Sequence, residues 1–311
     1  MAEAAPTPQT IVLPLVFLAA ALYLGHPALA LALGAALALG FDKEVLPGSS
    51  RYGKLFLQTA VVLLALKLDL STIVQVSGDF LPIVAGYVCV TLALGLLFGR
   101  LLRTETKCAQ LLSAGTAICG GTAVASLAPV IRASAGQISS VLALVFLLNA
   151  LAIVALPSVG AFLNMSQQQF GLWVALAVHD TSSVVGTAAA YGEEALELAT
   201  TVKLGRTLWL IPLLALWGMF ANGGRGKLNV PVFVLLFAGV AALNGLVAMP
   251  VGVAQIASPL SRWLLLAALF CIGLDLRRET LRTISPKLML HALGLWLIVL
   301  PVTALLAMRF G

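Results

Sequence analysis

Long apolar segments, many of about 20 residues, recur along nearly the whole sequence and are separated by short polar connections. A run of about 20 apolar residues is long enough to cross the hydrocarbon core of a bilayer as an α-helix. Only 10% of the 311 residues are charged, whereas soluble domains carry about a quarter. The pattern excludes a soluble globular protein and predicts an all-α polytopic membrane protein with a single transmembrane domain over residues 1–311.

The hydropathy pattern predicts eleven membrane segments, two of which are interrupted near their centres by small and polar residues. Interrupted segments of this kind are typical of the discontinuous helices that line transporter sites. The predicted segments are 11–24, 28–41, 53–72, 79–101, 108–132 (interrupted), 136–161, 167–190 (interrupted), 194–219, 229–248, 258–277 and 286–309. No basic residue precedes the first segment, so we expect it to be retained rather than cleaved as a signal peptide.

The basic residues of the connections predict the orientation. Connections 42–54, 100–107, 220–228 and 277–287 hold most of the Lys and Arg residues outside the apolar segments, and with eleven crossings all four lie on one side. Cytoplasmic loops are enriched in Lys and Arg, so we expect a cytoplasmic N-terminus and a C-terminus on the opposite side. Basic residues confined to short loops form no phosphate-binding face, which argues against nucleic acid as a partner.

The first interrupted segment carries small and hydroxyl-bearing residues at its centre. Adjacent glycines each disfavour a helix interior by about 1 kcal/mol, so we expect one helix to end near Gly120 and Gly121 and a second to begin at Thr122 as its N-cap. Broken backbone at membrane depth must be buried in protein or line a wet cavity. The amides of a second half-helix attract anions, so we predict that Thr116, Cys119, Gly120, Gly121 and Thr122 line a substrate site.

The second interrupted segment places an imidazole, a carboxylate and three hydroxyls in a row over His179–Ser183. Ionisable groups inside a membrane segment are costly and mark functional sites. We predict His179 and Asp180 as ion-coupling residues and Thr181, Ser182 and Ser183 as substrate ligands; a histidine that merely caps a carbonyl is the alternative. A metal site is disfavoured because no further His or Cys stands at ligand spacing, and no Gly-x-Ser-x-Gly elbow for a serine nucleophile is present at this segment.

Arg132 leaves two topologies open. If segment 108–132 crosses the membrane completely, Arg132 lies on the side opposite to the other basic connections. If segments 108–132 and 167–190 are instead re-entrant hairpins from opposite faces, Arg132 returns to the basic side and every other connection keeps its side. Both topologies bring the two interruptions toward the middle of the membrane.

Two cations lie inside the next segment. Lys203 and Arg206 are spaced i and i+3, on one face of a helix and about two turns from its Glu-rich start. They either extend toward the interface as amphipathic side chains do or provide positive charge for an anionic substrate, Arg206 as a planar fork and Lys203 as a point charge. Asn149, in an otherwise apolar segment, is expected to link helices.

Two distant stretches of the chain share a short, weak sequence similarity. Leu64–Ile73 and Phe270–Glu279 share Leu-Asp-Leu, and each closes one apolar segment and precedes another. They close the third and the tenth predicted segments, which are seven positions apart, so the two copies run in opposite senses. This arrangement predicts an inverted repeat, with Asp69 and Asp275 at the membrane interface.

Three motifs together resemble a known family. They are Gly115–Gly120, His179–Thr181 and Val202–Arg206, supported by Pro129–Ile131 and Gly273–Leu276. In this order and spacing they resemble the YeiH-like proteins, bacterial inner-membrane proteins described as sulfate exporters and grouped with sodium–proton antiporters and bile-acid sodium symporters. The resemblance covers most of the chain.

The resemblance implies a secondary transporter with inverted repeats and crossed discontinuous helices, in which a core moves against a panel. It implies that Gly120, Gly121, Thr122 and His179–Thr181 line the site. The chain departs from the family where Gly121-Thr122 replaces alanine and serine and where Ser182-Ser183 replaces a small residue and glutamine. The broken helices are also closer in sequence than in the wider superfamily.

These observations predict a bacterial inner-membrane transporter, not an enzyme, that moves a small anion such as sulfate, sulfite or an organic sulfonate. We expect no cofactor, coupling to a proton or a sodium ion, and the lipid bilayer and the anion as partners; a homodimer is compatible with the sequence. No ATP-binding loop of the Gly-x-x-x-x-Gly-Lys-[Ser/Thr] type is present. The alternatives are a cation–proton antiporter with Asp180 as ligand and an intramembrane enzyme that uses His179 with Ser182 or Cys119.

Overall fold

The computed structural model describes residues 8–41, 46, 48–67, 75, 78–220, 232–246, 251–274 and 284–311, and every named element in these ranges is helical. The helices are α1 (Pro8–Leu24), α2 (Pro27–Gly40), α3 (Ser49–Leu64) with a 3-10 turn η1 (Ala65–Lys67), α5 (Leu81–Leu101), α6 (Thr106–Ala117), α7 (Gly121–Val130), α8 (Ala135–Phe162), α9 (Gln167–Ala177), α10 (Thr181–Ala189), α11 (Glu193–Thr207), α12 (Leu210–Phe220), α13 (Val232–Leu246), α14 (Val251–Leu274) and α16 (Pro286–Phe310). The predicted all-α class is confirmed.

Most predicted segments coincide with one helix or with a pair of half-helices, but two details differ. Helix α3 begins before residue 53, so Arg51 and Lys54 belong to its first turns and not to a loop. The segment predicted as continuous over 194–219 divides into α11 and α12. Pro212 explains this division. In a continuous helix its ring would clash with the Leu208 carbonyl, and proline has no backbone N–H to donate to that carbonyl.

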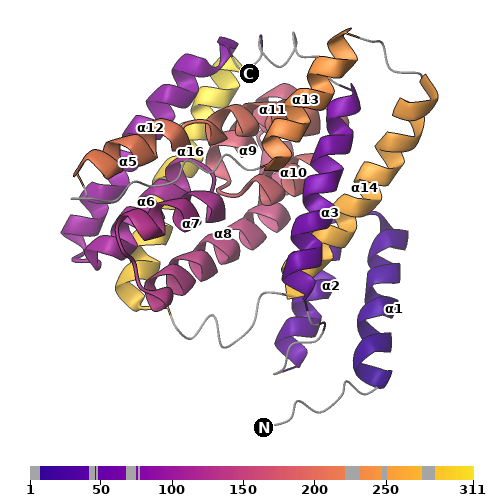
Figure 1. The fold of residues 1–311 in the computed structure, drawn as a ribbon, viewed down its shortest axis with the longest axis horizontal. Helices are drawn as coiled ribbons and strands as arrows, with labels where there is room; N and C mark the ends of the chain where they lie inside the picture. Colours follow the sequence, from indigo (N-terminus) through magenta and orange to yellow (C-terminus); the bar gives the residue numbers. More distant parts are fainter. Residues whose placement is uncertain are drawn as a thin grey trace.

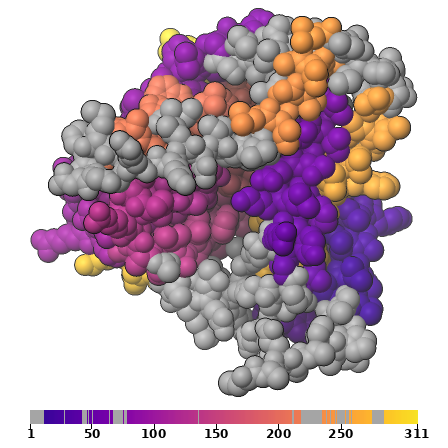
Figure 2. All heavy atoms as spheres, in the orientation of Figure 1, coloured from indigo at the N-terminus to yellow at the C-terminus, as the bar shows by residue number. Residues whose placement is uncertain are grey.

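The helices pack as two bodies around two hydrophobic clusters (Figure 1), the second of which also includes Ile153 of α8, Val185 of α10 and Leu204 of α11. The core body consists of α5–α12 and α16, and the panel body consists of α1–α3, α13 and α14. The two bodies touch mainly where α10 meets α2 and α14 and where α2 meets α8. Figure 2 shows α1, α3 and α14 of the panel body toward one side of the molecule and α6–α8 of the core body toward the other.

The panel body is built on tight helix crossings. Helices α3 and α14 are antiparallel, because Gly53 packs on Cys271 while the Ser261 hydroxyl donates to the Ala60 carbonyl at 2.8 Å. The shared Leu-Asp-Leu sequence predicts that these two helices run in opposite directions, and they do. Asp69 and Asp275 themselves lie outside the described residues. A Cβ at Gly273 would strike the backbone of α2, so only glycine permits that approach.

Helix α8 spans the core body and connects the two interrupted segments. Its 28 residues give a length of about 42 Å at 1.5 Å per residue, more than a hydrocarbon core of about 30 Å. It follows the first interrupted segment directly and precedes the second. The two interrupted segments are therefore attached to opposite ends of one membrane-spanning helix.

Candidate functional site

The first interrupted segment is a re-entrant hairpin. Helix α6 enters, the chain turns at Ile118–Gly120, and α7 returns to the same end of the molecule. The Lys107 ammonium, at the start of α6, donates to the Arg132 carbonyl just after α7 at 2.7 Å. A hydrogen bond between the entry and the exit is incompatible with a full crossing.

The second interrupted segment is also a hairpin, formed by α9 and α10 around Val178–Asp180. The Tyr191 hydroxyl, after α10, donates to the Met165 carbonyl, before α9, at 2.6 Å. The rings of Phe170 and Tyr191 stack with centroids 3.8 Å apart. Since α8 connects the roots of the two hairpins, they enter from opposite ends, and the re-entrant topology is the one that the structure has.

Short turns at the hairpin roots hold these entry points. Arg103, Arg132 and Asn164 follow α5, α7 and α8 with φ values of 51°, 52° and 51°. Each left-handed residue ends its helix, and the next amide bonds back to the preceding turn, as for Ala133 N–H to Ala128 O at 2.9 Å. Capping boxes at Ser134 and Ser166 then start α8 and α9.

The tips of the two hairpins meet. A Cβ placed on Gly120 would lie 3.1–3.2 Å from the backbone N, the Cα and the Cβ of Asp180. Gly120 also has φ 58° and ψ −118°, a conformation that glycine adopts most readily. The predicted N-cap at Thr122 is wrong: α7 begins at Gly121, and the cap position falls to Gly120 because the chain turns there.

The tips lie at the middle of the membrane by helix length. Helices α6 and α9 have 12 and 11 residues, so each tip is about 17–18 Å from its root. Two such hairpins from opposite ends meet near the centre of a hydrocarbon core about 30 Å thick. The sequence prediction that both interruptions approach the midplane is in accord with these lengths.

The carboxyl ends of α6 and α9 are closed by Arg206 of α11. Its Nε donates to the Ile118 carbonyl at 2.5 Å, and its terminal nitrogens donate to Leu176 and Val178 at 2.6 and 3.1 Å. A longer contact of 3.5 Å reaches the His179 carbonyl. One guanidinium thus joins the two hairpins and neutralises the negative ends of both half-helices.

Three further donors complete this carbonyl side of the tips. The Lys203 ammonium donates to the Val178 carbonyl at 2.8 Å. The Tyr87 hydroxyl of α5 and the Trp296 indole of α16 donate to the Thr116 and Ala177 carbonyls at 3.0 and 3.1 Å. Lys203 and Arg206 both have 0% exposure, so the interpretation that they extend to the interface is wrong.

The opposite, amide side of the tips is more open. Gly121, Thr122 and Asp180 are half-buried, whereas Gly120 and His179 are buried. Gly120, the N-cap residue of α7, makes no side-chain cap hydrogen bond, and the backbone N–H groups of a first helical turn have no acceptor within their own helix. Asp180 caps α10 by accepting from the Ser182 amide at 3.1 Å and from the Ser182 hydroxyl.

Asn149 and His179 form a further contact between α8 and the second tip. The Asn149 Oδ1 accepts from the His179 amide at 3.1 Å and lies 3.2 Å from His179 Nδ1. Both side chains are almost completely buried, with exposures of 2% and 1%. The expected helix-linking role of Asn149 is therefore directed at a proposed coupling residue.

The charges at the tips do not balance. Asp180 is the one carboxylate among residues 118–122 and 178–183, whereas Lys203 and Arg206 contribute two positive charges. The glutamates of α11 lie at its first turns, near the hairpin root. The buried centre of the core body therefore favours an anion.

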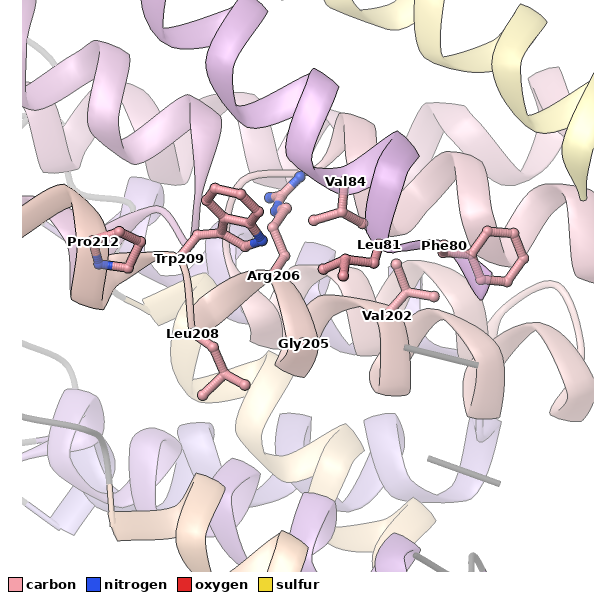
Figure 3. A pocket seen from close by; sticks show the side chains of 9 residues that line it. All are labelled: Phe80, Leu81, Val84, Val202, Gly205, Arg206, Leu208, Trp209 and Pro212. Atoms are coloured by element: carbon pink, nitrogen blue, oxygen red, sulfur yellow. The ribbon is translucent and has the colours of Figure 1, made fainter. Parts of the chain in front are cut away.

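Two cavities are lined in part by residues of α11. One, of about 590 Å³, lies between the bodies and is bounded by α3 and α14 on one side and by α10 and α11 on the other, with Arg262 and Glu193 in its lining. The other, of about 270 Å³, is mostly apolar. Figure 3 shows Arg206 in its wall, between Trp209 and Val84.

The structure brings all twelve predicted site residues together. Around the two tips lie Thr116, Cys119, Gly120, Gly121, Thr122, His179, Asp180, Thr181, Ser182 and Ser183, with Lys203 and Arg206 behind them. The sequence reasoning missed Tyr87 and Trp296. Each is an aromatic residue with a hydrogen-bond donor inside an apolar segment, and such a donor needs a partner when it is buried.

Comparisons with known proteins give consistent matches. A family described as "Conserved hypothetical protein 698" matches residues 11–292. A UPF0324 membrane protein of Bdellovibrio bacteriovorus is 40% identical over 278 residues, covering 88% of this chain and 86% of the relative. One from Vibrio vulnificus is 40% identical over 276 residues, covering 87% and 88%. No solved structure matches.

Proposed function

The chain belongs to the UPF0324 family of membrane proteins, in line with the resemblance to the YeiH-like proteins, and from that premise we propose that it is a secondary transporter of a small anion. Sulfate, sulfite or an organic sulfonate is the proposed substrate class. The proposed setting is the bacterial inner membrane, with the N-terminus cytoplasmic and the C-terminus periplasmic. The proposal treats the whole chain as one transport domain without a cofactor.

One observation carries the proposal: the tips of two opposed hairpins meet, and cations bind their carbonyls on one side while the N-terminus of α7 lies on the other. Broken helices at membrane depth occur where they line a site. The first turn of α7 carries the positive end of a helix dipole. Together with the excess of buried positive charge, this geometry suits a small oxyanion and disfavours a cation.

The proposed contacts divide between direct ligands and charge. The Gly121 and Thr122 amides and the hydroxyls of Thr122, Thr181 and Ser183 are the proposed direct donors, because they lie on the amide side. Lys203 and Arg206 face the carbonyls instead, so in this conformation they act on the anion through their charge. Low dielectric makes such fixed charges effective over several ångströms.

Alternating access is proposed to arise from movement between the two bodies. One hydrophobic cluster lies within the core body, whereas the cluster of the panel body also includes Ile153, Val185 and Leu204 of the core body. The cavity of about 590 Å³ separates part of α10 and α11 from α3 and α14. The tips belong entirely to the core body, so a shift of that body against the panel body would carry the anion with it. Ion coupling is assigned to His179 or Asp180.

The first experiment is a thermal-unfolding screen of detergent-purified protein against sulfate, sulfite, taurine, bicarbonate, small carboxylates and sodium. A ligand that binds only the folded state raises the melting temperature; at 100 times Kd the stabilisation is about 2.7 kcal/mol. We expect an oxyanion to raise the melting temperature more than a chloride salt of the same cation does at equal ionic strength. Ser158→Ala, at an exposed position of α8, should respond as the wild type does.

The screen also tests the competing transport function. Asp180 is the one carboxylate at the tips, which is the feature that a cation–proton antiporter would use. Stabilisation by sodium alone, abolished in Asp180→Asn, would replace the anion transporter with that antiporter. Stabilisation by no oxyanion at all would contradict the proposed function.

A further inference from the structure

Two buried polar atoms next to the tips lack a partner. The Nε2 of His179 and the Nδ2 of Asn149 make no hydrogen bond within the described part of the chain. Both atoms are enclosed, and their side chains are bonded to each other through Asn149 Oδ1. An unsatisfied buried polar group costs about 1–3 kcal/mol, so such a pair at a proposed transport site calls for a functional reason.

The geometry fixes which nitrogen of His179 carries the proton. The backbone N–H of His179 can only donate, so the Asn149 atom that faces it at 3.1 Å is the amide oxygen. The same oxygen lies 3.2 Å from His179 Nδ1. Because a carbonyl oxygen only accepts, Nδ1 must hold the hydrogen. Neutral His179 therefore keeps an unprotonated Nε2 with a free lone pair.

We propose that His179 Nε2 accepts the coupling proton of the transport cycle, and that Asn149 is the positioning residue that holds His179 in the tautomer with Nε2 free. This inference rests on the proposed anion transport and assigns its coupling ion. The proton binds at Nε2 as the anion binds on the amide side of the tips. It leaves Nε2 when the anion is released.

The surrounding charges link the two binding events. The charged groups next to His179 are Asp180 in the chain and Arg206 and Lys203 on α11. Tyr87 of α5 and Cys119 of the other tip lie next to Arg206, and Trp296 of α16 contributes an uncharged ring beside His179. Without an anion, a proton on Nε2 would add a positive charge to a centre that already has an excess. A bound anion offsets that charge, so each ligand raises the affinity for the other.

A proton fits this atom better than a metal cation does. Sodium and similar hard cations are bound by several oxygen ligands, whereas Nε2 is a single imidazole nitrogen with Arg206 directed at the neighbouring His179 carbonyl at 3.5 Å. The atom is enclosed by protein, and a proton needs no additional volume. Asp180, in contrast, already accepts from the Ser182 amide and hydroxyl.

The test measures proton uptake during anion binding. Sulfate is titrated into detergent-purified protein by calorimetry near neutral pH, in buffers that differ in ionisation enthalpy; sulfate remains a dianion there, so a bound proton belongs to the protein. We expect uptake of about one proton per sulfate, with affinity that rises up to about tenfold per unit decrease in pH. His179→Gln should bind sulfate with uptake near zero.

Two further variants separate coupling from structure. His291 of α16 is the matched control, since it has 0% exposure and both ring nitrogens lack a partner in the described chain; His291→Gln should keep the wild-type uptake. Asn149→Leu should lose uptake, and Asn149→Gln, which keeps an uncharged amide acceptor for Nδ1, should restore it. A purely structural Asn149 would change stability without changing proton stoichiometry.

The outcomes distinguish this inference from its premise. Sulfate binding without proton uptake in the wild type would overturn the coupling role and leave the anion transporter in place. Full uptake in His179→Gln would move the proton to another group and also overturn it. If sulfate does not bind, the best oxyanion of the thermal screen replaces it; if no oxyanion binds, the transport proposal itself fails.

Discussion

The two sides of the hairpin tips differ in how their backbone groups are satisfied. On the carbonyl side, Arg206, Lys203, Tyr87 and Trp296 donate to the ends of α6 and α9 with no exposure at the two cations. On the amide side, the N-cap of α7 makes no side-chain hydrogen bond, and Gly121 and Thr122 are half-buried. The comparison indicates that one side holds the hairpins together and the other is available to a ligand.

The largest effect is expected from Arg206→Ala. The substitution removes the donors for the Ile118 and Leu176 carbonyls, and each unsatisfied buried group costs about 1–3 kcal/mol. We expect destabilisation of about 3 kcal/mol or more and poor recovery of folded protein, measured by thermal unfolding and size-exclusion chromatography. A variant that folds like the wild type but loses anion affinity would make Arg206 a direct ligand instead.

The next effect concerns the contact between the tips. Gly120→Ala adds a Cβ that meets the Asp180 backbone at 3.1–3.2 Å in a conformation with φ 58°, and such backbone strain costs about 1–3 kcal/mol. We expect a lower melting temperature together with loss of transport in proteoliposomes. Gly136→Ala, at a glycine of α8 with open space around it, is the control that should retain both.

Lys203→Met tests the role of charge without direct contact. Its Val178 partner carbonyl is also reached by Arg206 at 3.1 Å, so we expect destabilisation of only about 1 kcal/mol. The excess positive charge at the tips falls by one, and anion affinity should fall about tenfold while the fold is kept. Titration calorimetry checks this, and unchanged affinity would show that the anion binds beyond the influence of Lys203.

The smallest effect is expected for Tyr87→Phe. The change removes one hydrogen bond to the Thr116 carbonyl at 3.0 Å and keeps the ring beside the Arg206 guanidinium, 5.1 Å from its centroid. We expect a loss of about 1 kcal/mol in stability and no change in anion affinity. A marked loss of affinity would place a ligand contact on the carbonyl side and contradict the assignment of ligand binding to the amide side.

Hydropathy and helix-breaking residues predicted the helices and the two interruptions, because membrane length and glycine chemistry act locally. Sequence did not decide between crossing and re-entrant segments, since the Lys107–Arg132 bond depends on how α6 and α7 fold back. Lys203 and Arg206 were identified from their charge, but their carbonyl partners lie on other helices. Asn149 was assigned only a linking role for the same reason.

The most direct test compares Gly121→Pro with Gly121→Ala for oxyanion binding. Proline is tolerated at the first helical position, and a Cβ at Gly121 meets only Leu142 and Phe146 at 3.6–4.0 Å, so both variants should fold. Only proline removes the Gly121 N–H. We predict that calorimetry finds near wild-type affinity for Gly121→Ala and a loss of about tenfold to hundredfold for Gly121→Pro. Equal affinities in the two variants would contradict an anion site on the amide side of the tips.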